Sequence, residues 1–297
     1  MDADPRLYVV TGADSGLGRA VADRLSAQGR VITCGIGDTV DVRADLATPE
    51  GRARLRIEVD ARSGGRVDGV VAAAGIGAPR VETVALNYFG AVAVLEDLRP
   101  LLARSAAPAA AVVSSSSTLN RGSGALVRAC LRGDEATARR VAARLIRTRR
   151  GSQLYRSSKI ALNQWIRTAS VRPEWAGRGI VVNAVAPGII ATELVMRNWE
   201  RERRLLETAL PQPLGAPGPV ASVAALLAHA VSAENRFLTG QVIYCDGGTD
   251  ALTRGTRPQR IFLRYRPREI RTLLRESRRL SAPPSPTRPD PARGAGS

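Results

Sequence analysis

The chain has 297 residues, of which 44% are hydrophobic, and its formal net charge is +17. This length suits one large α/β domain and is sufficient to bury a substantial core. Three widely separated cysteines and a single histidine, His229, fit neither a disulfide framework nor a metal cluster and exclude most histidine-based catalysis. The acidic start, Met1–Pro5, and the lack of any apolar run of membrane-spanning length predict a cytoplasmic protein outside the membrane.

The first elements of the chain predict a nucleotide-binding unit. Leu7–Val10 is an apolar run typical of a buried strand, Thr11–Gly18 is a glycine-rich turn, and Ala20–Gln28 has a helical pattern closed by Gly29. The glycines permit a tight turn and let a pyrophosphate approach the positive end of the following helix. The pair Asp45-Leu46 follows a third candidate strand, where a carboxylate is placed to receive an adenine amino group.

Further strands alternate with helical segments along the chain. The candidates are Val31–Ile36, Val67–Ala74, Ala110–Ser114, Ile180–Val185 and Val242–Cys245. This alternation predicts right-handed βαβ units, so the expected fold class is α/β, a Rossmann-type doubly wound parallel sheet in a single domain. We expect that domain over residues 1–252. A helical insertion of about 119–152 interrupts the rhythm and contains an arginine-rich helix, Asp134–Arg149.

The positive charge is concentrated at the C-terminal end. Residues Thr253–Ser297 hold twelve arginines against three acidic residues, which gives +9 and leaves +8 for the rest of the chain. Within this extension, Pro267–Leu280 has an amphipathic pattern, and the Pro/Ser/Gly-rich end from Ser281 is predicted to be disordered. We favour a solvated or self-docking extension over one that binds a polyanion, so nucleic acid is not the expected partner.

The chain has 43 arginines and one lysine, and that lysine stands four residues after a tyrosine. On a helix this spacing places Tyr155 and Lys159 on one face. A phenol has a reference pKa of about 10, and an adjacent ammonium lowers that pKa, so Tyr155 is able to exchange a proton with an alcohol or ketone oxygen. Ser114–Ser117 end a strand at the same sheet edge, where a hydroxyl is placed to bind the substrate oxygen; the alternative is a simple polar loop.

These motifs together resemble the short-chain dehydrogenase/reductase family over residues 7 to about 252. They are the glycine loop, Leu86-Asn87-Tyr88, the serine run, Tyr155-x-x-x-Lys159, Asn183-x-x-x-Pro187-Gly188 with Thr192, and Asp246-Gly247-Gly248. The resemblance implies that Tyr155 donates or accepts the proton and that Lys159 lowers its pKa and holds the nicotinamide ribose. It also implies that Asn87 supports a proton-relay water. Ser115 is the implied substrate-orienting serine, with Ser114 and Ser116 as register alternatives.

The resemblance further implies a site for a nicotinamide cofactor. Its expected residues are Gly12, Asp14, Ser15, Gly16, Leu17, Gly18, Asp38, Asp45, Leu46, Ala74, Gly75, Tyr155, Lys159, Pro187, Gly188, Ile190 and Thr192. NAD is favoured over NADP because Asp38, twenty residues beyond Gly18, is near the distance at which a carboxylate binds the ribose 2′-hydroxyl. The strand-end position itself falls nearer Ile36. Asp14 adds negative charge and Ser15 is not basic, whereas Arg43 is the cation that would favour NADP.

Two departures from the family pattern qualify the resemblance. Ala72-Ala73-Ala74-Gly75 replaces the family's Asn-Asn-Ala-Gly, which removes a side-chain hydrogen bond that braces the sheet, and the segment before Tyr155 is longer than usual. This insertion and the Val84–Gly90 segment are similar to the bacterial 3α-hydroxysteroid dehydrogenase/carbonyl reductase group and its coniferyl-alcohol dehydrogenase relatives. In that group the inserted helices reshape the subunit interface, so the resemblance implies a homodimer or a homotetramer.

The expected function is NAD-dependent oxidoreduction of a secondary alcohol or ketone on a bulky apolar or aromatic substrate, such as a steroid, a phenylpropanoid or a polyketide-like metabolite. The apolar residues after Gly188 that are expected to cap the pocket are Ile189, Ile190, Leu194, Val195, Met196 and Trp199; the alternative is that they serve ordinary helix packing. The alternatives are an NADP-dependent carbonyl reductase and a non-catalytic cofactor-binding regulator with a polyanion-binding tail. The intact Tyr155 and Lys159 pair argues against the regulator.

Overall fold

The structure of the protein is a computed structural model. It describes residues 5–256, 267–268 and 270–271. The chain divides into two compact units, Met1–Gly255 and Thr256–Ser297. The first unit therefore extends three residues past the expected boundary at 252, because a last helix runs to Arg254. The predicted amphipathic stretch Pro267–Leu280, apart from the four residues named above, and the end from Ser281 lie outside the described residues.

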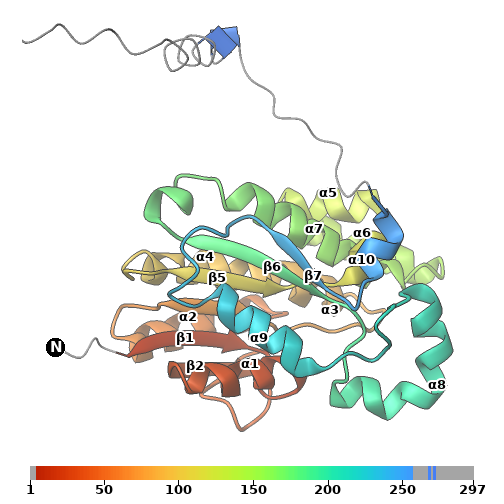
Figure 1. Cartoon of the computed structure of the whole chain (residues 1–297), viewed down its shortest axis with the longest axis horizontal. Helices are drawn as coiled ribbons and strands as arrows, with labels where there is room; N and C mark the ends of the chain where they lie inside the picture. Colours follow the sequence, from red (N-terminus) through yellow and green to blue (C-terminus); the bar gives the residue numbers. More distant parts are fainter. Residues whose placement is uncertain (1–4, 257–266, 269, 272–297) are drawn as a thin grey trace, which may run out of the picture. The chain divides into compact units, whose positions relative to one another are not determined.

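A seven-stranded, wholly parallel sheet forms the centre of the first unit (Figure 1). Its order is β3-β2-β1-β4-β5-β6-β7, with every neighbouring pair parallel. The strands are β1 (Arg6–Thr11), β2 (Gly29–Gly35), β3 (Val42–Arg43), β4 (Gly69–Ala72), β5 (Ala109–Val113), β6 (Val181–Pro187) and β7 (Val242–Cys245). The α/β class, the doubly wound parallel sheet and the six strands predicted by range are confirmed.

Helices fill the connections between the strands. They are α1 (Gly16–Ser26), α2 (Pro49–Ser63), α3 (Glu82–Val84), α4 (Ala91–Leu102), α5 (Gly124–Leu131), α6 (Glu135–Arg147), α7 (Gln153–Ala169), α8 (Glu193–Ala209), α9 (Val220–Ala230) and α10 (Thr249–Arg254). Three shorter helical turns are the π-helix η1 (Ala85–Gly90) and the 3₁₀ turns η2 (Ser116–Leu119) and η3 (Ala176–Arg178). No helix among residues 5–256 combines the length and apolarity that a membrane span requires.

Successive strand residues serve two separate cores, as the alternation of side chains in a strand requires. Val9 faces the core packed beneath α2, α4 and α7, whereas Val10 faces the core packed beneath α1 and α9. Both valines are fully buried. Figure 1 shows α1 and α9 on the near side of the sheet and α2, α4 and α7 behind it. The sheet is therefore covered on both faces, and only its edges and strand ends remain open to a ligand.

The first helix begins earlier than its apolar pattern indicates. It starts at Gly16, inside the glycine loop, and ends at Ser26. Gly29 does not close it, as expected from the sequence, but opens β2, where a Cβ would lie 2.2 Å from the main-chain oxygen of Arg6. The expectation for Gly29 was wrong because this glycine serves close packing between neighbouring strands rather than a helix end.

The predicted insertion consists of two helices, α5 and α6, of which the sequence pattern showed only the second. Asp134 caps α6 by accepting a hydrogen bond from Thr137 N at 2.9 Å, and α5 packs on α7. Glu135 binds Arg52 of α2 at 2.8 Å. The Arg52 guanidinium also donates to the main-chain oxygen of Leu46 at 2.9 Å, so the insertion is tied to the loop that follows β3.

The strand order reverses between β1 and β4. From β1 the chain moves outward to β2 and β3, then returns to β4 on the other side of β1. In open parallel sheets, ligands bind in the crevice at the carboxyl ends of the strands beside such a reversal. The loops after β1 and β4 open at this edge, together with those after β5 and β6.

Candidate active site

A cleft of about 820 Å³ lies at the carboxyl ends of the strands. It is lined by the loops after β1, β2, β3, β4, β5 and β6, and by residues of α7 and α8. Of the residues expected to bind cofactor, all but Asp38 line the cleft, and so do Ser115, Tyr155 and Lys159. The fold thus brings together residues that are up to 180 positions apart in the sequence, as Gly12 and Thr192 are.

The glycine loop is shaped by close backbone packing. A Cβ on Gly12 would lie 2.8 Å from Cα of Ala74, and one on Gly18 would lie 2.0 Å from the main-chain oxygen of Gly12. Gly16 has φ +53°, in the left-handed region that side chains disfavour. The hydroxyl of Thr11 binds Ala74 N at 3.2 Å, which joins the loops after β1 and β4.

The N-terminus of α1 points its free N–H groups at the cleft. The N-cap residue Ser15 makes no side-chain capping bond, and its side chain is exposed. Unsatisfied N–H groups and the positive end of a helix form a binding site for phosphate. The close-packed glycines and this uncapped helix end fit the pyrophosphate of a dinucleotide.

Ser115, at the end of β5, hydrogen-bonds the phenol of Tyr155 on α7. The Ser115 hydroxyl also accepts from Ser117 N at 3.1 Å, which caps η2. Ser114 instead donates to Asn163 Oδ1 at 2.6 Å, and the hydroxyls of Ser116 and Ser117 are buried. The second serine of the run is therefore the one paired with the phenol.

Burial raises the pKa of Tyr155, and the hydrogen bond with Ser115 lowers it by a smaller amount. The role of Lys159 in lowering this pKa stays a prediction. Lys159 Nζ donates to Val113 O at 2.6 Å and lies 5.9 Å from the centroid of the Tyr155 ring. At neutral pH the phenol therefore keeps its proton.

The pKa of Lys159 is itself shifted by the surroundings of its side chain. Its side chain is 3% exposed, and burial lowers its pKa from 10.5 to about 8. A buried cation with one carbonyl partner retains donor capacity for a further oxygen, since an ammonium has three N–H bonds. Its position beside Gly75, whose Cβ would lie 3.6 Å from Nζ, keeps it at the cleft.

Asn87 lies behind the cleft rather than on its surface. It is fully buried in the π-helix η1, where its amide accepts from Ile76 N and donates to Ile76 O, both at 2.9 Å. A Cβ on Gly75 would lie 3.1 Å from Asn87 Oδ1. The side chain thus fixes the loop after β4 against the lysine.

Asp38 is the expected cofactor residue that the fold does not bring to the cleft. Its side chain is 84% exposed and pairs with Arg43 at 2.5 Å. The cleft is lined instead by Gly35 and Ile36, at the end of β2. Counting twenty residues from the glycine loop overshoots here because β2 ends at Gly35, three residues before Asp38.

The apolar stretch after Gly188 lies only partly on the cleft. Ile189, Ile190, Leu194 and Val195 line it, together with Leu206 of α8, whereas Met196 and Trp199 do not. Sequence reasoning also missed four charged residues of the lining. These residues are Arg80, Glu82, Glu193 and Arg197. They follow no motif, because the loop after β4, the start of α3 and the first five residues of α8 bring them to the cleft.

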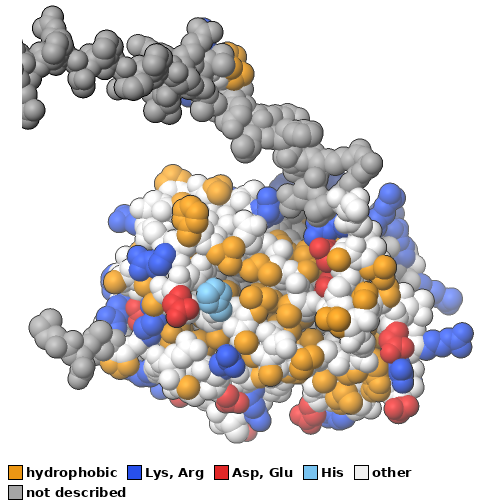
Figure 2. Space-filling view, viewed as in Figure 1, with side chains coloured by type: hydrophobic (Ala, Val, Ile, Leu, Met, Phe, Trp, Pro, Cys, Tyr) orange, Lys and Arg blue, Asp and Glu red, His pale blue; other side chains and the backbone are white. Residues whose placement is uncertain are grey.

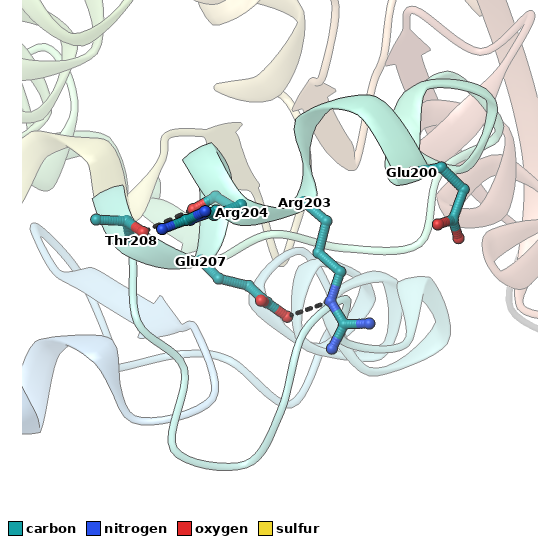
Figure 3. A pocket seen from close by; sticks show the side chains of 5 residues that line it. All are labelled: Glu200, Arg203, Arg204, Glu207 and Thr208. Carbon is teal, nitrogen blue, oxygen red and sulfur yellow. Dashed lines mark hydrogen bonds and ion pairs between the residues drawn. The ribbon is translucent and has the colours of Figure 1, made fainter.

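A second, smaller hollow lies on the outer face of α8 (Figure 3). Its five lining residues all belong to that helix, and Arg203 pairs with Glu207 at 3.1 Å. Such a pair at i, i+4 is typical of a solvated helix surface. The hollow contains none of the predicted site residues. Nowhere among residues 5–256 do three or more His, Cys, Asp or Glu side chains gather as metal ligands.

Known proteins with a similar sequence are dehydrogenases and reductases. A family model described as enoyl-(acyl carrier protein) reductase matches residues 12–250. The 3-alpha-hydroxysteroid dehydrogenase/carbonyl reductase of Comamonas testosteroni is 31% identical over 259 residues, covering 84% of this chain and 98% of that protein. The galactitol 2-dehydrogenase (L-tagatose-forming) of Cereibacter sphaeroides is 40% identical, over 95 residues that cover 32% of this chain and 36% of that one.

A solved structure shares the whole fold. The 3-alpha-hydroxysteroid dehydrogenase from Pseudomonas sp. B-0831, crystallised in complex with NADH, superposes with a TM-score of 0.77 at 36% identity. The match covers 84% of this chain and 99% of that one. The matched length is therefore close to that of the first unit.

Proposed function

The chain belongs to the short-chain dehydrogenase/reductase family, and we propose that it is an NAD-dependent oxidoreductase that interconverts a secondary alcohol and a ketone on a bulky apolar substrate. The observation that carries this proposal is the Tyr155 phenol, hydrogen-bonded to Ser115 and flanked by the buried Lys159, at the wall of one cleft with the glycine loop.

Each side chain has a distinct role in the proposed reaction. The Ser115 hydroxyl binds the substrate oxygen, and the Tyr155 phenol donates a proton to that oxygen during ketone reduction or accepts one during alcohol oxidation. The raised pKa of Tyr155 suits the donor role, because the phenol is protonated at neutral pH. Lys159 uses its remaining N–H bonds to hold a ribose hydroxyl. A bound nicotinamide supplies or accepts the hydride, chemistry that no side chain provides.

Asn87 acts as a positioning residue in this scheme. Its amide fixes the Ile76 backbone and lies beside Lys159 across Gly75, which suits it to support a water that returns the proton to the phenol.

The remaining residues proposed to bind the cofactor are divided among the parts of the dinucleotide. We assign the pyrophosphate to the glycine loop, from Gly12 to Gly18, and the adenine end to Asp45 and Leu46. The segment from Pro187 to Thr192 would hold the nicotinamide end. An NADH complex of a 36% identical relative supports NAD as the cofactor.

The substrate class follows from the rest of the cleft. Ile189, Leu194, Val195 and Leu206 present apolar surface on the side of α8, which suits a steroid-like, phenylpropanoid or polyketide-like carbon skeleton. The names of the relatives, a hydroxysteroid dehydrogenase among them, support the same class.

We further propose that the active form is a homo-oligomer. Figure 2 shows apolar side chains gathered over the face that carries α9 and β7. Phe237, in the loop between these elements, is 97% exposed, and within residues 5–256 β7 has a partner strand on one side only. An exposed aromatic side chain and an open sheet edge are both features of surfaces that bind another chain.

Replacement of Tyr155 by Phe tests the proposal. We expect NADH to bind with unchanged affinity, because the ring remains, while kcat for reduction of a bulky ketone falls by about 10²- to 10⁴-fold. Cofactor binding is read from nicotinamide fluorescence, and turnover from absorbance of NADH over a panel of steroid, aromatic and aliphatic ketones. Ser117→Ala, which removes a hydroxyl outside the cleft, is the control and should retain turnover. A Tyr155→Phe rate near that of the wild type would contradict the proton-transfer role.

A further inference from the structure

The carboxylate of Asp14 lies across the end of β2. Asp14 belongs to the glycine loop after β1, yet its Oδ2 accepts hydrogen bonds from Ile36 N at 3.1 Å and Gly37 N at 3.0 Å. These are the first two residues beyond β2. The loop after one strand thus delivers a negative charge to the carboxyl end of its neighbour.

Two glycines leave room for this carboxylate. A Cβ on Gly35 would lie 2.7 Å from Cγ of Asp14, and a Cβ on Gly37 would lie 3.3 Å from its Oδ2. A side chain at Gly35 would therefore collide with the Asp14 carboxylate. The sequence Gly35-Ile36-Gly37 is shaped around the Asp14 side chain.

The end of β2 is where dinucleotide-binding sheets usually carry the carboxylate that binds the adenine ribose. Here that place is taken by Ile36, whose side chain lines the cleft, is 67% exposed and offers no hydrogen bond. Asp38 is outside the cleft and paired with Arg43. Asp14 is the lining carboxylate that contacts this strand end.

We propose that Asp14 replaces the strand-end carboxylate: it binds the adenine-ribose hydroxyls of NAD and repels the 2′-phosphate of NADP. This inference rests on the proposed function, since it assigns a residue to the same cofactor site. Oδ2 is held by two main-chain N–H groups, while Oδ1 accepts no hydrogen bond within residues 5–256 and is available for a hydroxyl pair. Two backbone donors fix the carboxylate before the ligand arrives.

The charges around Asp14 agree with this selection. Arg19 of α1 donates from its guanidinium to the main-chain oxygen of Asp14 rather than to its carboxylate. Arg43, on the neighbouring strand β3, is paired with Asp38. A 2′-phosphate would therefore meet the Asp14 carboxylate while Arg43 is already engaged.

The test compares two carboxylate-to-amide substitutions of equal charge change in the full-length protein. For Asp14→Asn we expect the Kd of NADH to rise about 10- to 100-fold, the loss typical of hydrogen bonds to a charged group, and the preference for NADH over NADPH to fall at least tenfold. The amide oxygen of Asn still accepts from Ile36 N and Gly37 N, so the loop keeps its shape. For Asp38→Asn we expect an unchanged Kd for NADH. Both constants are read by nicotinamide fluorescence, without turnover.

A second variant distinguishes the loss of a contact with the cofactor from a folding defect. Adding Ile36→Asp to Asp14→Asn returns a carboxylate to the strand end at a position that already lines the cleft, and we expect it to restore NADH affinity and selectivity. Loss of NADH binding that Ile36→Asp does not repair would overturn the inference, as would an unchanged Asp14→Asn or a loss confined to Asp38→Asn. A wild type that prefers NADPH overturns it too. A wild type that binds neither cofactor overturns the proposed function with it.

Discussion

A single buried ammonium carries much of the chemistry proposed for the cleft, and it does so at a cost in stability. Lys159 is 3% exposed and has one protein acceptor, the main-chain oxygen of Val113. Desolvation of the charged form lowers its pKa to about 8. A group that the fold holds in an unfavourable state is typical of a functional site, where selection acts on activity rather than on stability.

This cost predicts a pH-dependent difference between the wild type and Lys159→Met. Between about pH 8 and 10.5, Lys159 is protonated in the unfolded protein but not in the folded protein. The free energy of unfolding of the wild type therefore rises with pH across this range. Below pH 8 the full penalty applies, and we expect Lys159→Met to be more stable by up to about 3 kcal/mol.

Urea denaturation of both proteins at pH 7, 9 and 10.5 measures the difference. Taking the difference removes the opposite contribution of other groups, such as Cys34, whose pKa burial raises to about 12. A gap between the two proteins that does not change with pH would mean that the lysine is not perturbed.

At the scale of elements, the contact between α6 and α2 connects the insertion to the cofactor cleft. The Arg52 and Glu135 side chains are 13% and 23% exposed. Burial by itself raises the pKa of Glu135, but its hydrogen bonds with Arg52 and Arg139 outweigh this effect, and the pKa is lowered. Arg52 in turn holds the main-chain oxygen of Leu46, a residue that lines the cleft.

We therefore expect Glu135→Gln to destabilise the protein by about 1–3 kcal/mol, because it leaves a poorly solvated guanidinium without its counter-ion. The matched control is Glu58→Gln, which breaks the exposed pair with Arg62 and should cost less than about 0.5 kcal/mol. Both values come from urea denaturation at pH 7. Since the pKa of Glu135 is lowered in the folded state, its contribution is present at neutral pH and is lost as the pH falls below 4.5. Equal effects of the two substitutions would contradict this account.

Elements with a strong local pattern could be predicted from the sequence, and those built by tertiary contacts could not. The apolar runs around Val9 and Val182 identify buried strands without any partner in view. For the two-residue strand β3 the sequence indicates only a candidate strand before Asp45, without bounds, and the helix α5 has no comparable pattern. In the cleft, the spacing of Tyr155 and Lys159 is local, whereas the carboxylate of Asp14 reaches the end of β2 through a contact 22 residues away in the sequence.

At the scale of the whole molecule, the first compact unit contains the sheet, both cores and the cleft. Its last helix, α10, is fixed by Arg254, which pairs with Asp250 at 2.5 Å and lies over the ring of Tyr244 at 5.1 Å. The compact unit therefore includes the chain as far as Gly255, three residues beyond the boundary at 252 that the sequence indicated.

We expect a protein ending at residue 256 to keep its melting temperature and its turnover, because the described residues that line the cleft all lie between Gly12 and Leu206. Removal of everything from Thr253 should instead lower stability, because Arg254 is lost from Tyr244. Thermal unfolding and ketone reduction measure the two effects. Binding to a heparin column shows separately whether the basic extension holds polyanions. Loss of turnover in the longer truncation would mean that the extension contributes to the cleft.

Lys159 is the only lysine of the sequence, which makes it a selective target for chemical labelling. Because the sequence contains no other lysine, an amine-directed reagent has a single side-chain target in the whole protein, besides the terminal amine. With a pKa of about 8, roughly half of the Lys159 amines are neutral and nucleophilic at that pH, yet the reagent must enter through the cleft to reach them. One mass increment per chain then reports access to Lys159, and protection by a ligand reports that the cleft is occupied, so this single amine serves as a labelling probe for screening substrates.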